Sequence, residues 1–344
     1  MSYNKLCKII LPFLLSAIIV SVISIPTNFN GNPNTIIALH VSGPKPVTNA
    51  SLMISNDSGF ITYGFPGNGS AENPYRIENY SLVFTFNSTT AGILIENVTK
   101  HFIIRNLTLT NNNTELLGTG IRILADNGVI ENVTIENTLN GIHLEGNNLQ
   151  VNYTAINSQQ FGLWSKECTN LNITSNNITG AAYGVYLLSC NKTIISDNII
   201  FNGNNGIQIY GSTNFEIKHN IISQNSEKGL FIVETPPKKG EINLVIRNWF
   251  FQNEMQALVI TDDINTIFYD VTSQEGNYWS DWRGWGNYKI QTDVYDIYPL
   301  DQNLELATRY PFKFWFWIFA PIIIALGAVT YFFYWKLIIQ PTKE

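Results

Sequence analysis

Residues 120–140 are GIRILADNGVIENVTIENTLN, residues 141–161 are GIHLEGNNLQVNYTAINSQQF, and residues 184–205 are GVYLLSCNKTIISDNIIFNGNN. Each stretch begins with a glycine before aliphatic residues at alternate positions, and short apolar alternations follow between Gly, Asn and Ser. The starting glycines recur every 21 to 23 residues: Gly120, Gly141, Gly162, Gly184, Gly206 and Gly229. A unit of this length built only from strand patterns cannot bury its apolar side alone, so we expect successive units to stack.

The repeat predicts an all-β protein, a right-handed single-stranded parallel β-helix of eight to nine coils that rise by ~4.8 Å each. Leucine-rich repeats have a similar period, but their L-x-x-L-x-L spacing is missing. We expect Gly92 and Ala257 to extend the register of the glycines. The predicted organisation is an N-terminal extension or cap at 26–60, the β-helix at 61–275, a C-terminal cap motif at 276–300 and a juxtamembrane stalk at 301–312.

The composition agrees with stacking, because 43 of the 344 residues are Asn and 46 are Ile. Identical residues in successive coils form columns, so Ile fills the interior, while Asn tolerates left-handed turns and its amides hydrogen-bond along a column. Asn198 and Asn220 both lie 14 residues after their glycine, as such a column requires. Only 13% of the residues are charged and the net charge is −6, so a nucleic-acid partner is not expected.

Both ends of the chain have membrane patterns. Residues 1–25 place two lysines before an apolar run, which predicts a signal peptide cleaved after Ser24 or, alternatively, a retained signal anchor. Residues 313–338 predict a transmembrane helix, because Trp315 to Trp335 has no charge and is flanked by aromatic residues. Lys336 and Lys343 then predict that the tail at 339–344 is cytoplasmic. The expected localisation is the cell membrane, with a single pass and an extracellular β-helix.

The predicted extracellular part contains thirteen N-x-S/T sequons, each an acceptor for N-glycosylation on a translocated chain. They are Asn49, Asn56, Asn68, Asn79, Asn87, Asn97, Asn106, Asn112, Asn132, Asn152, Asn172, Asn177 and Asn191. Many lie within strand-like stretches, so we expect only some of them to be modified.

Three features together resemble the NosD-type right-handed β-helix family. They are GFPGNGSAENPYRIENYSL at 64–82, the G-I-x-I repeats, and GNYWSDWRGW at 276–285. The resemblance covers residues 60 to 300 and implies a carbohydrate-binding or sugar-hydrolase β-helix domain of an archaeal cell-surface type. Family members often continue with an acidic D-G-D-G loop, whereas this chain has GWGNYKIQTDVYDIYPL, so a cation site in that loop is in doubt.

Residues two and four positions after each glycine are expected to point outward, and several of them are aromatic. We predict a binding surface for a polysaccharide or a cell-surface protein from His143, Trp164, Tyr186, Tyr210 and Phe231. The alternative is that another segment covers these residues as ordinary core. Trp279, Trp282 and Trp285 form a second aromatic group, which either covers the last coil or stacks on sugar rings.

Cys168 and Cys190 both lie six residues after their glycine, so stacking brings them within disulfide distance. An extracellular disulfide and a stacked pair of free thiols are equally open alternatives, since Ser212 has the same place one coil later.

The sequence contains no complete catalytic constellation. Asp262 and Asp263 resemble the paired acids of pectin-degrading hydrolases without their accompanying motifs, and the outward cluster of His143, Glu145 and Lys166 lacks a second acid. The sequence favours a binding or structural protein at the cell surface, with a polysaccharide hydrolase or lyase as the alternative.

Copper or other metal delivery of the NosD type is a further alternative. His101, His143 and His219 have different offsets from their glycines, so we expect no metal site and no cofactor.

Overall fold

The computed structural model describes residues 51–84, 91–111, 118–233, 242–260 and 265–300. Among these residues, no helix is long and apolar enough to cross a membrane. The predicted signal segment, stalk, transmembrane helix and tail lie outside the described residues, as do Asn49, Asn87, Asn112, Asp262 and Asp263.

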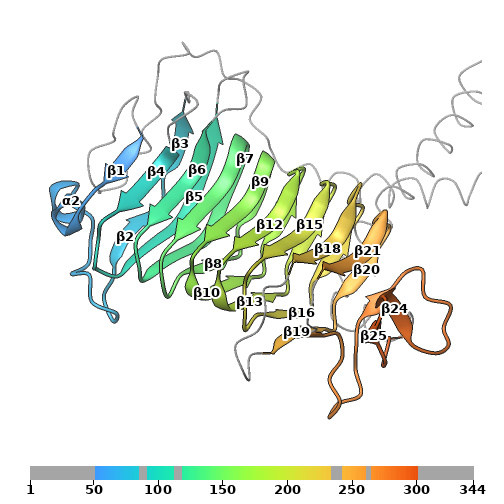
Figure 1. The fold of residues 1–344 in the computed structure, drawn as a ribbon. Helices are drawn as coiled ribbons and strands as arrows, with labels where there is room; N and C mark the ends of the chain where they lie inside the picture. Colours follow the sequence, from blue (N-terminus) through green and yellow to red (C-terminus); the bar gives the residue numbers. More distant parts are fainter. Residues whose placement is uncertain (1–50, 85–90, 112–117, 234–241, 261–264, 301–344) are drawn as a thin grey trace, which may run out of the picture. The chain divides into compact units, whose positions relative to one another are not determined.

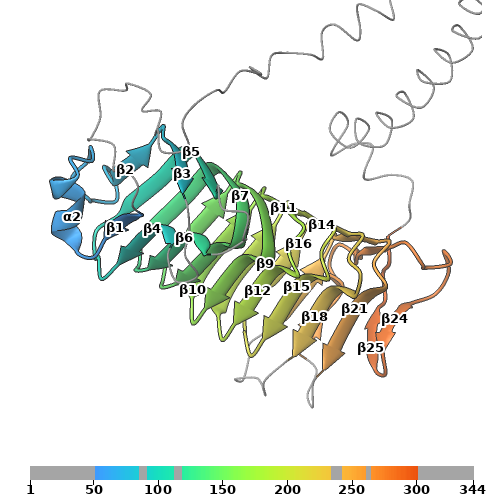
Figure 2. The same ribbon diagram turned by 90° about the horizontal axis from the view of Figure 1, so that it is seen from above.

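The described chain winds into nine coils, and each coil contributes one strand segment to each of three parallel faces (Figures 1 and 2). Face 1 consists of β1 (Leu52–Ile54), β4 (Ala91–Glu96), β6 (Thr119–Leu124), the end of β7 (Gly128–Glu145), the end of β9 (Ala155–Lys166), β12 (Tyr183–Leu188), β15 (Asn205–Tyr210), β18 (Lys228–Val233) and β21 (Met255–Ile260).

The other two faces share the long strands of the middle coils. Face 2 consists of β2 (Tyr75–Glu78), the start of β5 (Phe102–Asn111), the start of β7, β8 (Gln150–Asn152), β10 (Thr169–Thr174), β13 (Asn191–Ser196), β16 (Glu216–Lys218), β19 (Asn243–Ile246) and β22 (Thr266–Ile267). Face 3 consists of β3 (Ser81–Phe84), the end of β5, the middle of β7, the start of β9, β11 (Asn177–Thr179), β14 (Ile199–Phe201), β17 (Ile221–Ser223), β20 (Trp249–Phe251) and β23 (Tyr278–Trp279).

Aliphatic side chains of equivalent positions fill the interior in columns. Val185 pairs with Leu163 in the preceding coil and with Ile207 in the next, and all three side chains are fully buried. The repeated glycine permits close approach: a Cβ atom on Gly162 would lie 2.4 Å from the carbonyl oxygen of Gly184. The expected columns of stacked Ile and related residues are therefore present.

The register differs from the expectation at both ends. Ala257 pairs with Leu230, so Gln256 takes the place of the glycine in that coil and the predicted position was wrong by one residue. Parallel pairing also begins before residue 61, since β1 pairs with β4.

Turn residues explain the abundance of asparagine. Ten of the 22 described non-glycine residues with positive φ are Asn, a residue that tolerates this conformation. Asn79, Asn106 and Asn132 have this geometry between faces 2 and 3 in successive coils, and their amides hydrogen-bond to one another at 3.3 and 2.8 Å.

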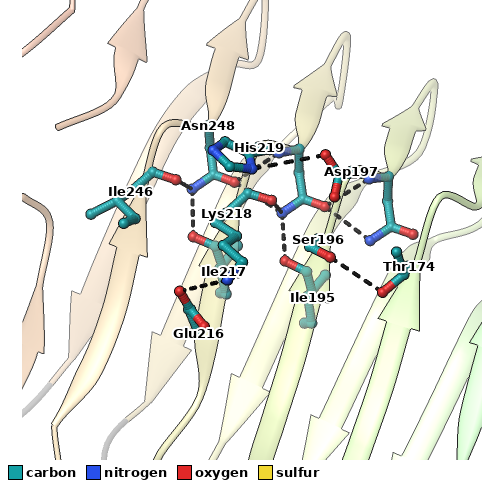
Figure 3. Close-up of polar contacts among 12 residues, drawn as sticks. Thr174, Ile195, Ser196, Asp197, Glu216, Ile217, Lys218, His219, Ile246 and Asn248 are labelled. Carbon is teal, nitrogen blue, oxygen red and sulfur yellow. Dashed lines mark hydrogen bonds and ion pairs between the residues drawn. The ribbon is translucent and has the colours of Figure 1, made fainter. Parts of the chain in front are cut away.

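A buried asparagine column runs beside these turns: Asn176, Asn198, Asn220, Asn248 and Asn277. Nδ2 of Asn198 donates to Oδ1 of Asn220 at 2.9 Å, and Nδ2 of Asn220 donates in the same way to Asn248. Figure 3 shows Asn248 where it also donates to the carbonyl oxygens of Ile217 and Ile246. The predicted column through Asn198 and Asn220 is present and has five members.

Each end of the described β-helix is covered by a local element. The short helix α2 (Asp57–Thr62) presents Phe60, whose ring stacks on Tyr75 at 4.7 Å. At the other end β24 (Tyr288–Gln291) and β25 (Val294–Asp296) form an antiparallel hairpin. These elements place aromatic rings over the first and last coils, which keeps open strand edges away from solvent.

Candidate functional site

The outer side of face 1 carries aromatic residues on consecutive coils. Trp164 lies in register with His143 in one neighbouring coil and with Tyr186 in the other. Gln208 and Phe231 continue this position in the next two coils. The predicted outward column is therefore formed, and parallel register is what brings residues about 22 positions apart into contact.

We define the aromatic surface as six rings of face 1 that are neither buried nor fully exposed: Phe161, Trp164, Tyr183, Tyr186, Tyr210 and Phe231. The rings contact one another in a chain. The Phe161 centroid lies 5.3 Å from Trp164 and 5.1 Å from Tyr183, and both pairs are stacked. Tyr186 lies 5.8 Å from Tyr210, which in turn lies 5.9 Å from Phe231. The surface is continuous over four coils, about 14 Å at the usual strand spacing.

Phe161 and Tyr183 were missed by the sequence analysis. Each directly precedes the glycine of its coil, and the two pair with each other across β9 and β12. Strict alternation predicts that the residue before the glycine points inward, but the glycine and the residue after it are both buried, so the residue before it lies on the outside. Two aromatic residues at the same place before successive glycines were the signal that could have found them.

His143 lies beneath this surface, because it is only 5% exposed and its ring stacks parallel to Trp164 at 4.0 Å. Its Nε2 lies 3.0 Å from Oε1 of Glu145, without the alignment of a hydrogen bond. Burial and the nearby Arg122 cation lower the pKa of His143 to about 4, although Glu145 opposes this. At neutral pH His143 is therefore uncharged and supports the Trp164 ring.

Several buried polar atoms on this side of face 1 have no hydrogen-bond partner. They are Nε of Arg122, Oδ1 of Asn140, Nε1 of Trp164 and Oδ1 of Asn205. Buried donors and acceptors are normally satisfied, and leaving one unpaired costs about 1–3 kcal/mol. The outer side of face 1 thus combines aromatic rings with buried donors and acceptors that have no hydrogen-bond partner in the structure.

The three cap tryptophans have different environments. Trp279 is 1% exposed and stacks between Phe250 at 4.6 Å and Tyr288 at 4.3 Å, so the hypothesis that it contacts a ligand is wrong. Trp282 is half-buried and its Nε1 donates to the carbonyl oxygen of Gly286. Trp285 is 75% exposed. The structure therefore brings none of these three into the aromatic surface of face 1. Trp279 lies in the last coil itself, and Tyr288 of the hairpin stacks over it.

Cys168 and Cys190 are both buried and both are free thiols in the structure. Each Sγ donates to carbonyl oxygens, that of Cys168 to Leu144 at 3.4 Å and that of Cys190 to Leu188 at 3.6 Å. The hydrogen bond with Cys190, together with burial, raises the pKa of the Cys168 thiol. The structure contains the free-thiol alternative, and a disulfide in the oxidised protein stays a prediction.

None of the described sequon asparagines is buried. Seven are exposed, namely Asn56, Asn68, Asn79, Asn97, Asn106, Asn132 and Asn177, and three are half-buried, namely Asn152, Asn172 and Asn191. Their use as glycan acceptors stays a prediction.

His143 and His219, two of the described histidines, lie on different parts of the coil. His143 lies on face 1, whereas His219 lies in the turn between faces 2 and 3, where its Nδ1 is 3.8 Å from Oδ1 of Asp197 (Figure 3). In the part of the chain that the structure describes, no three His, Cys, Asp or Glu residues gather as a metal-binding group. The cluster of His143, Glu145 and Lys166 does form beside Trp164, since both charged residues act on the His143 pKa.

One comparison with known proteins supports the fold. A family model described as a right-handed β-helix region matches residues 119–272, so the β-helix is right-handed. The chain is similar to the tailspike protein gp49 of the Acinetobacter baumannii bacteriophage Fri1, a capsular polysaccharide depolymerase, with 13% identity and a TM-score of 0.29 over 62% of this chain and 48% of the tailspike.

It is also similar to the A-module of the Azotobacter vinelandii mannuronan C-5 epimerase AlgE4, with 12% identity and a TM-score of 0.27 over 63% of this chain and 90% of the module. The chain spans about half the length of the tailspike. No curated protein matches the chain. At these identities and TM-scores the two likenesses add no functional argument.

Proposed function

We propose that the β-helix binds polysaccharide on the aromatic surface of face 1. The C–H groups on the face of a sugar ring pack against the electron-rich face of an aromatic ring, and sugar hydroxyls need hydrogen-bond partners. Trp164 is half-buried, with one face of its ring stacked on His143, and its Nε1 is a buried donor without a partner. The observation that carries the proposal is the unbroken contact of six rings along the coil axis, which suits a linear, repeating ligand.

The proposal includes the cellular context predicted from the sequence. Residues 1–25 direct the chain across the membrane, residues 313–338 anchor it, and the β-helix is displayed outside the cell as a glycoprotein of the NosD type, as in archaeal surface proteins. The sequons and the uncharged run at 315–335 support this placement. Carbonate extraction of membranes, combined with protease treatment of intact cells, tests it: release of the chain by carbonate or protection of the β-helix contradicts it.

A retention assay tests the binding function. The full chain, purified in detergent, is passed over immobilised polysaccharides. The Trp164→Ala and Tyr186→Ala variants are compared with the parent chain. We expect both variants to lose retention while their thermal unfolding midpoints stay near that of the parent chain. Tyr153→Asn is the matched control, because Tyr153 is 68% exposed in a turn of positive φ away from face 1.

Unchanged retention of both variants contradicts the proposed surface. A polysaccharide hydrolase or lyase is the second candidate, and incubating any retained polymer with the protein tests it by the appearance of shorter products. The cluster beside Trp164 favours this candidate only weakly, because His143 is covered by the ring of Trp164.

A further inference from the structure

Resting on the proposed glycan-binding function, we propose that the ligand is an acidic polysaccharide whose anionic groups bind Arg122 at the N-terminal end of the aromatic surface, with Lys166 beside it. Both cations lie on the outer side of face 1. Arg122 is in register with His143, and Lys166 is in register with Leu188 two residues beyond the Trp164–Tyr186 pair.

Arg122 differs from the other half-buried arginines of the described chain. Arg105 lies 2.6 Å from Glu78, Arg76 lies 3.5 Å from the same carboxylate group, and Arg247 pairs with Glu275. Arg122 has no acidic group within 4.0 Å in the described residues, and its Nε is buried without a hydrogen-bond partner. A partly desolvated guanidinium without a counter-ion is costly, and a planar carboxylate or sulfate is the group that its fork of donors fits.

The other charged side chains of this group have partners, so Arg122 is the cation that is left unpaired. Arg122, Glu145 and Lys166 all act on His143, which is itself neutral at pH 7 because its pKa is about 4. Glu145 is held 3.0 Å from Nε2 of His143, and Lys166 contacts only the exposed Glu167 at 3.4 Å. Lys166 is thus paired with Glu167, and Glu145 lies against the neutral His143, which leaves Arg122 as the cation of this group without an acidic group of the described residues within 4.0 Å.

The His143–Trp164 stack connects the cation to the rings. The two rings lie 3° from parallel at 4.0 Å, and Trp164 continues into Phe161 at 5.3 Å. A sugar stacked on Trp164 therefore has Arg122 within one or two coils along the same column. An acidic group on that sugar or on its neighbour supplies the missing counter-ion.

Binding of matched neutral and acidic polymers to the full chain tests the inference. The probes are dextran, carboxymethyl-dextran and dextran sulfate, and polygalacturonate with its methyl ester, so that each comparison changes charge on one backbone. We expect an acidic member to bind about tenfold or more tightly than its neutral counterpart, the range of one charge-assisted hydrogen bond. The carboxylate and sulfate arms separate the two anionic groups.

Two variants should change the preference for the acidic polymer in opposite directions. Arg122→Gln removes the preference for the acidic polymer, whereas Glu145→Gln increases it, because that substitution deletes the carboxylate that lies against His143 and would repel an anionic ligand. Arg76→Gln is the control, since Arg76 lies on face 2.

Equal binding of acidic and neutral polymers, together with loss of both in Trp164→Ala, overturns this inference and leaves the proposed function standing. Arg122→Gln that keeps the preference also overturns the inference. Binding to none of the probes counts against both the inference and the proposed function.

Discussion

The backbone nitrogen of Asn277 donates to Oδ2 of Asp296 across 2.6 Å, and this contact ends the buried asparagine column. For each earlier asparagine of the column the backbone nitrogen donates to the Oδ1 of the next asparagine, as Asn220 does to Asn248 at 3.0 Å. Asp296 also accepts from Nε1 of Trp279 at 2.9 Å and from the Tyr298 nitrogen at 3.0 Å. The cap hairpin therefore supplies the acceptor that a tenth coil would otherwise provide.

The contribution of the cap hairpin to stability should increase on mild acidification. Burial raises the pKa of Asp296 to about 6, although its hydrogen bonds with Asn277 and Trp279 oppose this. Because the folded state binds this proton more tightly than the unfolded chain, its contribution to stability is full below pH 4 and is lost as the pH rises through 6. A rise of about two pKa units corresponds to about 3 kcal/mol at most. Chemical denaturation of the chain and of Asp296→Asn at pH 4.5 and 7 measures this difference, which the variant should lack.

The contribution of His143 to stability should change with pH in the opposite direction over the same range. Its pKa is lowered from 6.5 to about 4, so its contribution to stability is present above pH 6.5 and is lost as the pH falls through 4. The two effects partly cancel in the parent chain. His143→Asn should therefore be more acid-resistant than the parent chain below pH 6, and a variant with the same pH profile as the parent contradicts the assigned pKa.

Substitution in the buried asparagine column should lower the stability far more than substitution of an exposed turn asparagine. Asn220→Ala leaves two donors of Asn198 without the Oδ1 acceptor that now lies 2.9 and 3.0 Å from them, at a cost of about 3 kcal/mol or more. Asn148→Gly is the matched control, because Asn148 is exposed and its φ of 55° suits glycine, so we expect a loss below about 1 kcal/mol. Thermal unfolding followed by circular dichroism compares the two variants. Equal losses of stability would contradict a stabilising role of the buried column.

Phe161→Ala should weaken glycan retention as much as Trp164→Ala does. Phe161 contacts three other rings of the aromatic surface, those of Trp164, Tyr183 and Tyr186, all within 5.4 Å. Its removal interrupts the surface between two coils. The retention assay measures the effect, and retention close to that of the parent chain would exclude Phe161 from the binding surface.

Cys190→Ser should cost less than about 1 kcal/mol in protein kept reduced, because serine is nearly isosteric and can make the same bonds. Ser212 already has this place one coil later, where its Oγ donates to the carbonyl oxygen of Tyr210 and accepts from the Cys190 nitrogen at 3.0 Å. If a Cys168–Cys190 disulfide forms in oxidised protein, the same substitution there should cost about 2–5 kcal/mol. Mass analysis with and without reductant shows which state is being compared.

Trp279→Ala should destabilise the chain by about 3–5 kcal/mol, whereas Trp285→Ala should change stability by less than about 0.5 kcal/mol. Trp279 is enclosed by Phe250, Tyr288 and Asp296, while Trp285 is 75% exposed. Denaturant midpoints of the two variants measure this, and similar midpoints would contradict the role of Trp279 as the core residue that joins the last coil to the hairpin.

The coil repeat was predictable because it is local and periodic. The glycine spacing, the Ile columns and the pairing of Asn198 with Asn220 follow from one rule, that equivalent residues stack. Ala257 departs from that rule because the coil from Gly229 to Gln256 is 27 residues long and contains an insertion. The number of inserted residues does not follow from the spacing of the apolar residues, so the predicted position is one residue too late.

The sequence alone determined that this chain is a parallel β-helix and which residues form its outward aromatic column. Only the tertiary structure decided that Phe161 and Tyr183 join that surface and that His143 is buried and neutral beside Trp164. It also decided that no acidic group of the described residues lies within 4.0 Å of Arg122 and that Asp296 ends the asparagine column. The physical reason is that strand periodicity specifies the direction of a side chain, whereas burial, charge pairing and pKa depend on neighbours that lie one coil or more away in the sequence.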